Sequence, residues 1–143
     1  MTWTARSPGE ATGRAAHRGR PVRVLVVDDS LVFRTGMTRA VQACDDMKLV
    51  GEADGGEAAL EAIAHLDPDL VILDLLMPDL DAFGVLRALH AQPTPPECRV
   101  LVISATLEDQ VERELLAAGA DACMSKASSR ANICDVALRL VAQ

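Results

Sequence analysis

The sequence has almost no aromatic residues. They make up 2% of its 143 residues, tyrosine is absent, and the set is Trp3, Phe33 and Phe83. Proteins that bind single-stranded nucleic acid stack bases on aromatic side chains, so this composition excludes such a platform. No apolar run approaches the roughly 20 residues that a membrane-spanning helix needs. Because 50% of the residues are hydrophobic, a core can form, but it must be aliphatic.

Basic residues are also scarce. Lysine and arginine number 14 against 21 acidic residues, which gives a formal net charge of −7. The first 21 residues hold four arginines and one glutamate, so the acidic excess lies in residues 22–143. An acidic domain repels nucleic acid and suits cations or basic protein surfaces. We therefore expect no direct DNA binding.

The four cysteines, Cys44, Cys98, Cys123 and Cys134, form no Cys-x-x-Cys pair. The N-terminal residues lack the apolar core of a secretory signal. We therefore expect a cytoplasmic protein with reduced thiols and no membrane association.

The length fits one domain. Residues 1–21 contain Gly, Pro, Ser, Thr, Ala and Arg without apolar periodicity, and we expect a disordered tail there. The pattern changes at Pro21, so we place the folded domain at residues 22–143.

Short apolar runs alternate with helical patterns along this domain. The expected strands are 22–27, 48–53, 70–73, 100–103 and 122–125. A first helix is expected directly after Ser30, which can cap it. Four further helices are expected at 57–66, 83–91, 109–118 and 129–141. Five strand–helix units with short loops predict an α/β fold, a doubly wound parallel sheet with helices on both faces.

Polar residues follow four of the five strands. Asp28-Asp29, Asp74, Ser104 and Lys126 each stand where a strand ends. Because the carboxyl ends of parallel strands share one edge, these side chains should converge in one crevice.

This set of residues suits phosphoryl transfer. Three carboxylates in one crevice repel each other unless a proton or a cation neutralises them, and all-oxygen ligands favour Mg²⁺. Lys126 offers a mobile positive charge, and Ser104 offers a hydroxyl donor. Asp74, alone on the expected central strand, is the natural nucleophile.

Each of these residues is ordinary when taken alone. A strand-end aspartate or serine is usually a cap or a turn residue, and a lone lysine is usually solvated. Their arrival together on successive strand ends favours the functional interpretation. We interpret Asp79 and Asp81, in the loop after Asp74, as turn residues.

The motifs that carry these residues resemble the receiver domain of two-component response regulators. They are Val24-Leu25-Val26-Val27-Asp28-Asp29-Ser30, Leu73-Asp74-Leu75-Leu76-Met77-Pro78, Ser104-Ala105 and Ser125-Lys126. Residues 31–37 and 49–53 look most like receivers of LuxR-type regulators. The resemblance covers residues 22–143 and implies the (βα)5 flavodoxin-like form of the fold.

The resemblance also implies roles for the site. Asp74 would accept phosphate from a phosphohistidine of a sensor histidine kinase, with Lys126 and Ser104 contacting the phosphoryl group. The implied Mg²⁺ ligands are Asp28, Asp29, Asp74 and the main-chain carbonyl of Leu76. The chain would be a signalling phosphoacceptor, and would catalyse only its own phosphotransfer and dephosphorylation.

The chain departs from the family pattern at Cys123, where an aromatic residue is usual, and at Ala127, where proline is common. The chain ends at Gln143, so we expect a stand-alone receiver without an output domain. It would signal through residues 109–141 to another protein or relay the phosphate. The sequence does not decide whether the chain forms a homodimer.

Two alternatives remain. One is a receiver-like binding module that acts without phosphorylation, because Cys123 degrades the switch. The other is a phosphatase of doubly wound fold, although such enzymes usually carry Asp-x-Asp after the first strand.

Overall fold

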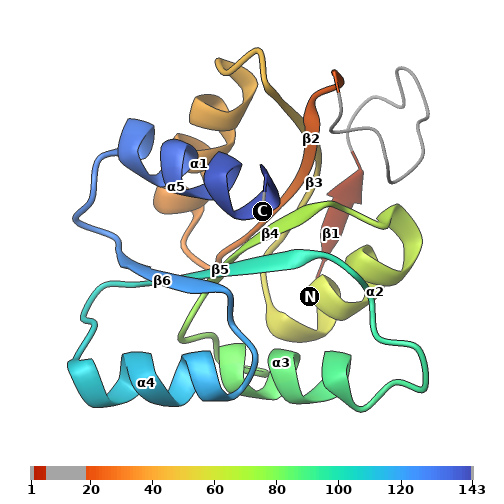
Figure 1. The fold of residues 1–143 in the computed structure, drawn as a ribbon, viewed down its shortest axis with the longest axis vertical. Helices are drawn as coiled ribbons and strands as arrows, with labels where there is room; N and C mark the ends of the chain where they lie inside the picture. The colour runs from red at the N-terminus through yellow and green to blue at the C-terminus, as the bar shows by residue number, and fades with distance from the viewer. Residues whose placement is uncertain (1, 6–18, 143) are drawn as a thin grey trace.

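A six-stranded sheet forms the centre of the computed structural model, which describes residues 2–5 and 19–142. The strands lie in the order β1-β3-β2-β4-β5-β6 (Figure 1). Their bounds are β1 Trp3–Ala5, β2 Val22–Val27, β3 Met47–Ala53, β4 Leu70–Asp74, β5 Arg99–Ser104 and β6 Ala122–Ser125. The pairs from β3 through β6 are parallel, whereas β1 runs antiparallel to β3.

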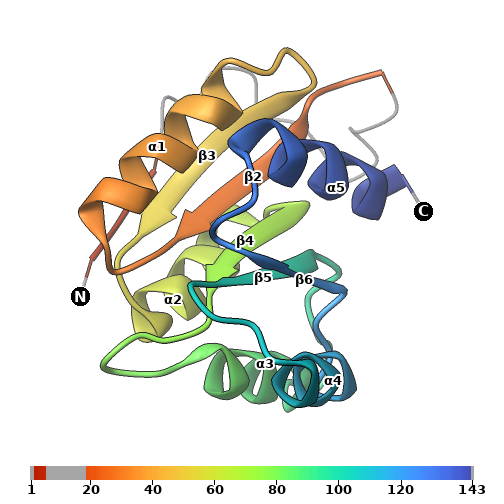
Figure 2. The same ribbon diagram turned by 90° about the vertical axis from the view of Figure 1, so that its left-hand side faces the viewer.

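Helices cover both faces of the sheet. Figure 2 shows α1 (Leu31–Gln42) and α5 (Arg130–Ala142) on one face. The other face carries α2 (Gly56–Leu66), α3 (Ala82–His90) and α4 (Asp109–Ala117). The predicted doubly wound, flavodoxin-like α/β fold is confirmed.

The core consists of two aliphatic clusters, one on each face of the sheet. Successive side chains of a strand point to opposite faces, so β2 contributes to both clusters. Val24 and Val26 pack with α1 and α5, whereas Leu25 and Val27 pack with α2 and α3. All four are fully buried, which explains why this strand is a continuous apolar run.

The expected element boundaries hold to within a few residues. Ser30 caps α1 as predicted, because its hydroxyl accepts a hydrogen bond from the backbone N–H of Phe33 at 3.3 Å. The last helix begins at Arg130 and ends at Ala142, one residue later than expected at each end. Within the described ranges, no helix is long and apolar enough to cross a bilayer.

The strand β1 is the main departure from the sequence-based expectation. Trp3–Ala5 pairs with the outer edge of β3, so the expectation of a disordered tail over residues 1–21 is wrong for these three residues. Residues 6–18 of that expected tail lie outside the described residues. A three-residue strand has too few positions for a periodic apolar pattern, and this is why the composition did not reveal it.

Contacts at the start of β1 hold it in place. The backbone N–H of Thr2 donates to Oδ1 of Asp54 at 2.7 Å, and the backbone N–H of Asp54 donates to the Thr2 carbonyl at 3.0 Å. The Trp3 ring lies 5.6 Å from that of His65. Hydrogen bonds from Thr2 outweigh burial and lower the pKa of Asp54.

We predict that Asp54→Ala releases β1 without unfolding the domain. The variant loses the acceptor for the Thr2 N–H, so the fluorescence of Trp3, the only tryptophan, should shift to the red. The free energy of unfolding should change by less than about 1 kcal/mol, because the hydrogen bonds are exposed. Asp45→Ala, at an exposed carboxylate before β3, is the matched control. An unchanged emission spectrum in Asp54→Ala would contradict the docking of β1.

Candidate functional site

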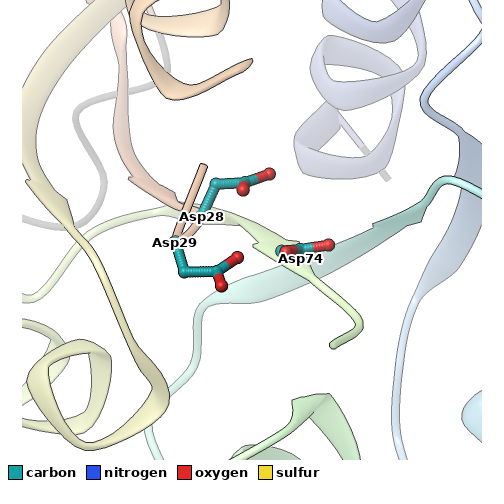
Figure 3. Close-up of side chains that lie close together, drawn as sticks. All are labelled: Asp28, Asp29 and Asp74. Carbon is teal, nitrogen blue, oxygen red and sulfur yellow. The ribbon is translucent and has the colours of Figure 1, made fainter. Parts of the chain in front are cut away.

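The site lies where the chain order reverses within the sheet. Strand β2 has β3 on one side and β4 on the other, and the carboxyl ends of β2 and β4 flank a crevice at this point. Asp28 and Asp29 follow β2, and Asp74 ends β4 (Figure 3). One carboxylate oxygen of each residue lies within 4.8 Å of the others. The predicted convergence of these three side chains is therefore present in the structure.

Asp28 is the most deeply buried of the three, with no exposed surface. Its Oδ1 accepts a hydrogen bond from the backbone N–H of Ser30 at 2.8 Å. Its Oδ2 has no aligned hydrogen-bond donor among the described residues, and only the ion pair with Lys126 at 2.7 Å compensates it. Arg34 braces the same segment, because Nη1 donates to the Asp28 carbonyl and Nε pairs with Glu52 at 3.0 Å.

Lys126 supplies the positive charge inside the crevice. Its Nζ lies 2.7 Å from Oδ2 of Asp28 and 3.3 Å from Oδ1 of Asp74. The backbone N–H of Lys126 donates to the Ser104 carbonyl at 2.8 Å, which fixes the start of the side chain. Burial acts to lower the pKa of Lys126, but the two carboxylates raise it overall. The ammonium therefore stays charged at neutral pH.

The environment of Asp74 disfavours its charged form. Burial, together with the nearby charge of Asp28, raises the pKa of Asp74 from 3.8 to about 7, although Lys126 acts in the opposite direction. One lysine does not compensate three carboxylates, so negative charge accumulates in the crevice.

The donor set suits a hard divalent cation. Three carboxylates offer only oxygen, and Asp29 is exposed while its two neighbours are buried, so the site is open on one side. Mg²⁺ keeps several waters and binds through one or two carboxylates. The under-compensated Oδ2 of Asp28 is a further sign that this crevice is built for added positive charge.

Ser104 and Leu76 are the other two predicted site residues, and the contacts described for them are with residues outside the acidic cluster. Ser104 is buried at the end of β5, and its hydroxyl donates to the Thr106 carbonyl at 2.7 Å. The Leu76 side chain is 67% exposed. Hydrogen bonds of Leu75 to Ile103 and Ala82, both 2.9 Å, fix the backbone that leads into Leu76. The roles of Ser104 and of the Leu76 carbonyl stay predictions.

Asp79 has a structural role that the sequence analysis missed. Its two carboxylate oxygens accept hydrogen bonds from the backbone N–H groups of Gly56 and Glu57, at 3.1 and 3.0 Å. Helix α2 has Gly55 at its cap position, without a side-chain cap, so the loop after Asp74 supplies the cap instead. A Cβ atom at Gly55 would lie 2.9 Å from Oδ1 of Asp79, and one at Gly56 would overlap the Leu80 carbonyl. The Gly55-Gly56 pair was the signal for this close approach.

The fold and the site together define a doubly wound α/β protein with an acidic pocket able to hold a cation and a lysine at the switch point of its sheet. The comparison with known sequences makes this specific. Residues 24–138 match the response regulator receiver domain, so the chain belongs to this family.

Similar proteins include NarL, a transcriptional regulatory protein of Mycobacterium tuberculosis. It is 43% identical over 113 residues, which cover 78% of this chain and 51% of NarL. The solved receiver domain of NarL superimposes with a TM-score of 0.81 at 38% identity, covering 85% of this chain and 97% of that one. The CheX–CheY–BeF3–Mg²⁺ complex from Borrelia burgdorferi matches with a TM-score of 0.71 at 27% identity, covering 80% of this chain and 85% of that one.

A protein-glutamate methylesterase/protein-glutamine glutaminase of Myxococcus xanthus is 41% identical over 111 residues, which cover 78% of this chain. That match spans 32% of the methylesterase. The chain thus spans about a third to about half the length of the curated relatives it matches.

We predict that Asp74→Asn stabilises the metal-free protein above neutral pH. In the unfolded chain Asp74 loses its proton near pH 3.8, and in the folded chain near pH 7. Between these values the folded state holds a proton that the unfolded state has released, so the free energy of unfolding falls as pH rises. Asparagine removes this penalty.

The gain of Asp74→Asn should be near zero at pH 4 and on the order of 4 kcal/mol at pH 8. Urea unfolding in chelator at both pH values measures it. A gain that is equal at the two pH values would contradict the assigned pKa shift.

We also predict that Asp79→Ala lowers the free energy of unfolding by about 1–2 kcal/mol, because two N–H groups at the start of α2 lose their acceptor. Asp79→Asn keeps one acceptor oxygen and should retain part of this stability. Thermal unfolding of the two variants beside the wild type tests this. Equal stability of Asp79→Ala and the wild type would show that the loop does not cap α2.

Proposed function

We propose that the chain is a signalling phosphoacceptor that takes a phosphoryl group from a sensor histidine kinase onto Asp74. The observation that supports this most strongly is the pocket itself. Asp74 lies at the end of a central strand, with Lys126 3.3 Å from its Oδ1 and two further carboxylates beside it. Membership of the receiver family agrees with this role.

In the proposed reaction, a carboxylate oxygen of Asp74 attacks the phosphorus of a phosphohistidine. A phosphorus–oxygen bond forms, the phosphorus–nitrogen bond breaks, and the imidazole leaves with its electron pair. Lys126 is the ammonium that can pair with the new phosphoryl oxygens, and the Ser104 hydroxyl is the nearby donor if it leaves Thr106. The product is an acyl phosphate, which water hydrolyses back to the carboxylate.

The proposed cofactor is Mg²⁺, held by Asp28, Asp29, Asp74 and the Leu76 carbonyl. When bound, it would offset the repulsion between carboxylates and phosphoryl oxygens. A similar receiver, the CheY of Borrelia burgdorferi, has been solved with BeF3 and Mg²⁺. The three carboxylates of this chain offer oxygen donors within 4.8 Å of one another.

An apolar rim beside the pocket suits a docked kinase. Leu31 and Val32 begin α1 and are 65% and 83% exposed, and Leu76 follows Asp74 and is 67% exposed. These are three of the four large hydrophobic side chains exposed in the described part of the chain. A helical kinase domain that covers them would exclude water around the phosphohistidine during transfer.

The surface formed by residues 109–141 is the proposed contact with a downstream protein. Strand β6 is the last in the sheet order, all four of its residues are half-buried, and α4 buries only Leu115 fully. We propose signalling by protein contact or phosphorelay in the cytoplasm. Self-association through this surface is part of the same proposal.

A second candidate is a binding module that acts without phosphorylation, and Cys123 is the observation in its favour. Cys123 lies on β6 against the core cluster under α4, where the family usually has an aromatic residue. Burial, with a smaller effect of Glu112, raises the pKa of its thiol to about 11, so it behaves as a small apolar group. A cysteine side chain is smaller than an aromatic ring. A movement of Ser104 would therefore be transmitted less effectively to the surface formed by residues 109–141. In this case a phosphoryl mimic would perturb the pocket but not residues 109–141.

We predict that Asp74→Asn abolishes phosphate uptake. Intact-protein mass spectrometry after incubation with acetyl phosphate and Mg²⁺ should show one added phosphoryl group on the wild type and none on the variant. Lys126→Ala should slow uptake by about tenfold or more, because it removes the ammonium that meets the phosphoryl charge.

Chelation of Mg²⁺ is expected to stop uptake by the wild type. Asp109→Asn, an exposed carboxylate at the start of α4, is the matched control and should behave as the wild type. Undiminished uptake in Asp74→Asn would contradict the proposed acceptor.

A further inference from the structure

The ring of Phe33 lies against two cationic side chains. Nζ of Lys126 is 4.6 Å from the ring centroid, and the guanidinium carbon of Arg130 is 4.2 Å from it. Phe33 belongs to the first turn of α1 and is 8% exposed, whereas Lys126 follows β6 and Arg130 begins α5. The ring therefore joins the start of α1 to the distant segment between β6 and α5, beside the acidic pocket.

Lys126 needs a fixed position that its ion pairs alone do not provide. A lysine side chain has four rotatable carbons, and its ammonium can satisfy carboxylates from several directions. In this crevice both carboxylate partners, Asp28 and Asp74, are also proposed metal ligands. The face of Phe33 adds a third contact that does not compete for a carboxylate. Such contacts strengthen when the cation is withdrawn from water, and the Lys126 side chain is 19% exposed.

Arg130 and the helix backbone hold the ring itself. Nε of Arg130 is buried and has no hydrogen-bond acceptor among the described residues, and the guanidinium carbon packs 4.2 Å from the centroid of the Phe33 ring. Gly36 makes room for it, since a Cβ atom there would lie 3.2 Å from Nη2 of Arg130. On the other side, the hydrogen bond from the Phe33 N–H to Ser30 fixes the backbone that carries the ring.

We propose that Phe33 is a positioning residue that holds the Lys126 ammonium over the pocket, ready for a phosphoryl group on Asp74. The inference rests on the proposed function in one respect, namely that Lys126 meets the phosphoryl group. Phe33 itself touches neither the phosphoryl group nor the metal ligands in this account. Its effect passes through Lys126, and the ring, rather than apolar volume alone, is what the position requires.

The test compares Phe33→Leu, which keeps apolar volume but has no ring, with Phe33→Tyr, which keeps the ring. The first measurement is the proton chemical shift of the Lys126 ε-methylene group without any phosphoryl mimic. A nearby aromatic face moves these protons upfield. We expect the upfield shift in the wild type and in Phe33→Tyr, and its loss in Phe33→Leu.

The second measurement is the apparent dissociation constant of beryllofluoride at saturating Mg²⁺. It should rise by about three- to tenfold in Phe33→Leu and return to the wild-type value in Phe33→Tyr. Met37→Leu is the matched control, because Met37 lies one turn further along α1 in the same core cluster. It should change neither measurement. If Phe33→Leu does not fold, Phe33→Met replaces it.

The outcomes separate this inference from the proposed function. If the wild type binds no beryllofluoride, the proposed function fails, and the Lys126 chemical shift alone decides the inference. If the wild type binds it and Phe33→Leu matches the wild type in either measurement, the inference is overturned. An equal loss in Met37→Leu would also overturn it, because general packing would then explain the effect.

Discussion

The repulsion between buried carboxylates at the carboxyl ends of β2 and β4 is the constraint on which the site depends. Asp28 has no exposed surface, and its neighbour Asp74 is almost as buried, so neither charge is screened by water. Lys126 offsets part of this charge at 2.7 and 3.3 Å. Burial, together with the remaining repulsion from Asp28, raises the pKa of Asp74 to about 7, and the pocket stays short of positive charge. Such a pocket suits a divalent cation, and the positive charge of that cation would in turn allow a negatively charged phosphoryl group to bind beside it.

The fold makes this arrangement stable by fixing the backbone on every side of the crevice. Two aliphatic clusters hold the sheet from both faces, so the strand ends have little freedom to separate. Local contacts then secure each functional segment. Arg34 binds the carbonyl of Asp28, Asp79 ties the loop after Asp74 to α2, and the Lys126 backbone bonds to β5. Packing of the core and hydrogen bonds outside the pocket thus offset the unfavourable repulsion between the carboxylates.

Much of this was predictable from sequence, because the signals were periodic or stood at strand ends. The apolar run before Asp28-Asp29 predicted a strand buried on both faces, and the positions of Asp74 and Lys126 followed from strand order. Trp3 and Asp79 were not predictable in the same way. The strand of Trp3 is too short for a pattern, and the cap that Asp79 provides depends on a helix more than 20 residues earlier in the chain. The contact of Phe33 with Lys126 is likewise tertiary, since helical spacing shows only that Phe33 faces the core.

The most direct test of the electrostatic account is a carbon-13 NMR titration of the Asp74 side-chain carboxyl, with and without Mg²⁺. The account predicts a pKa of about 7 in the metal-free protein, where burial and Asp28 oppose ionisation, and a much lower value when Mg²⁺ is present. A pKa near the ordinary value of 3.8 that does not respond to Mg²⁺ would contradict it, because the three carboxylates would then not form one coupled site.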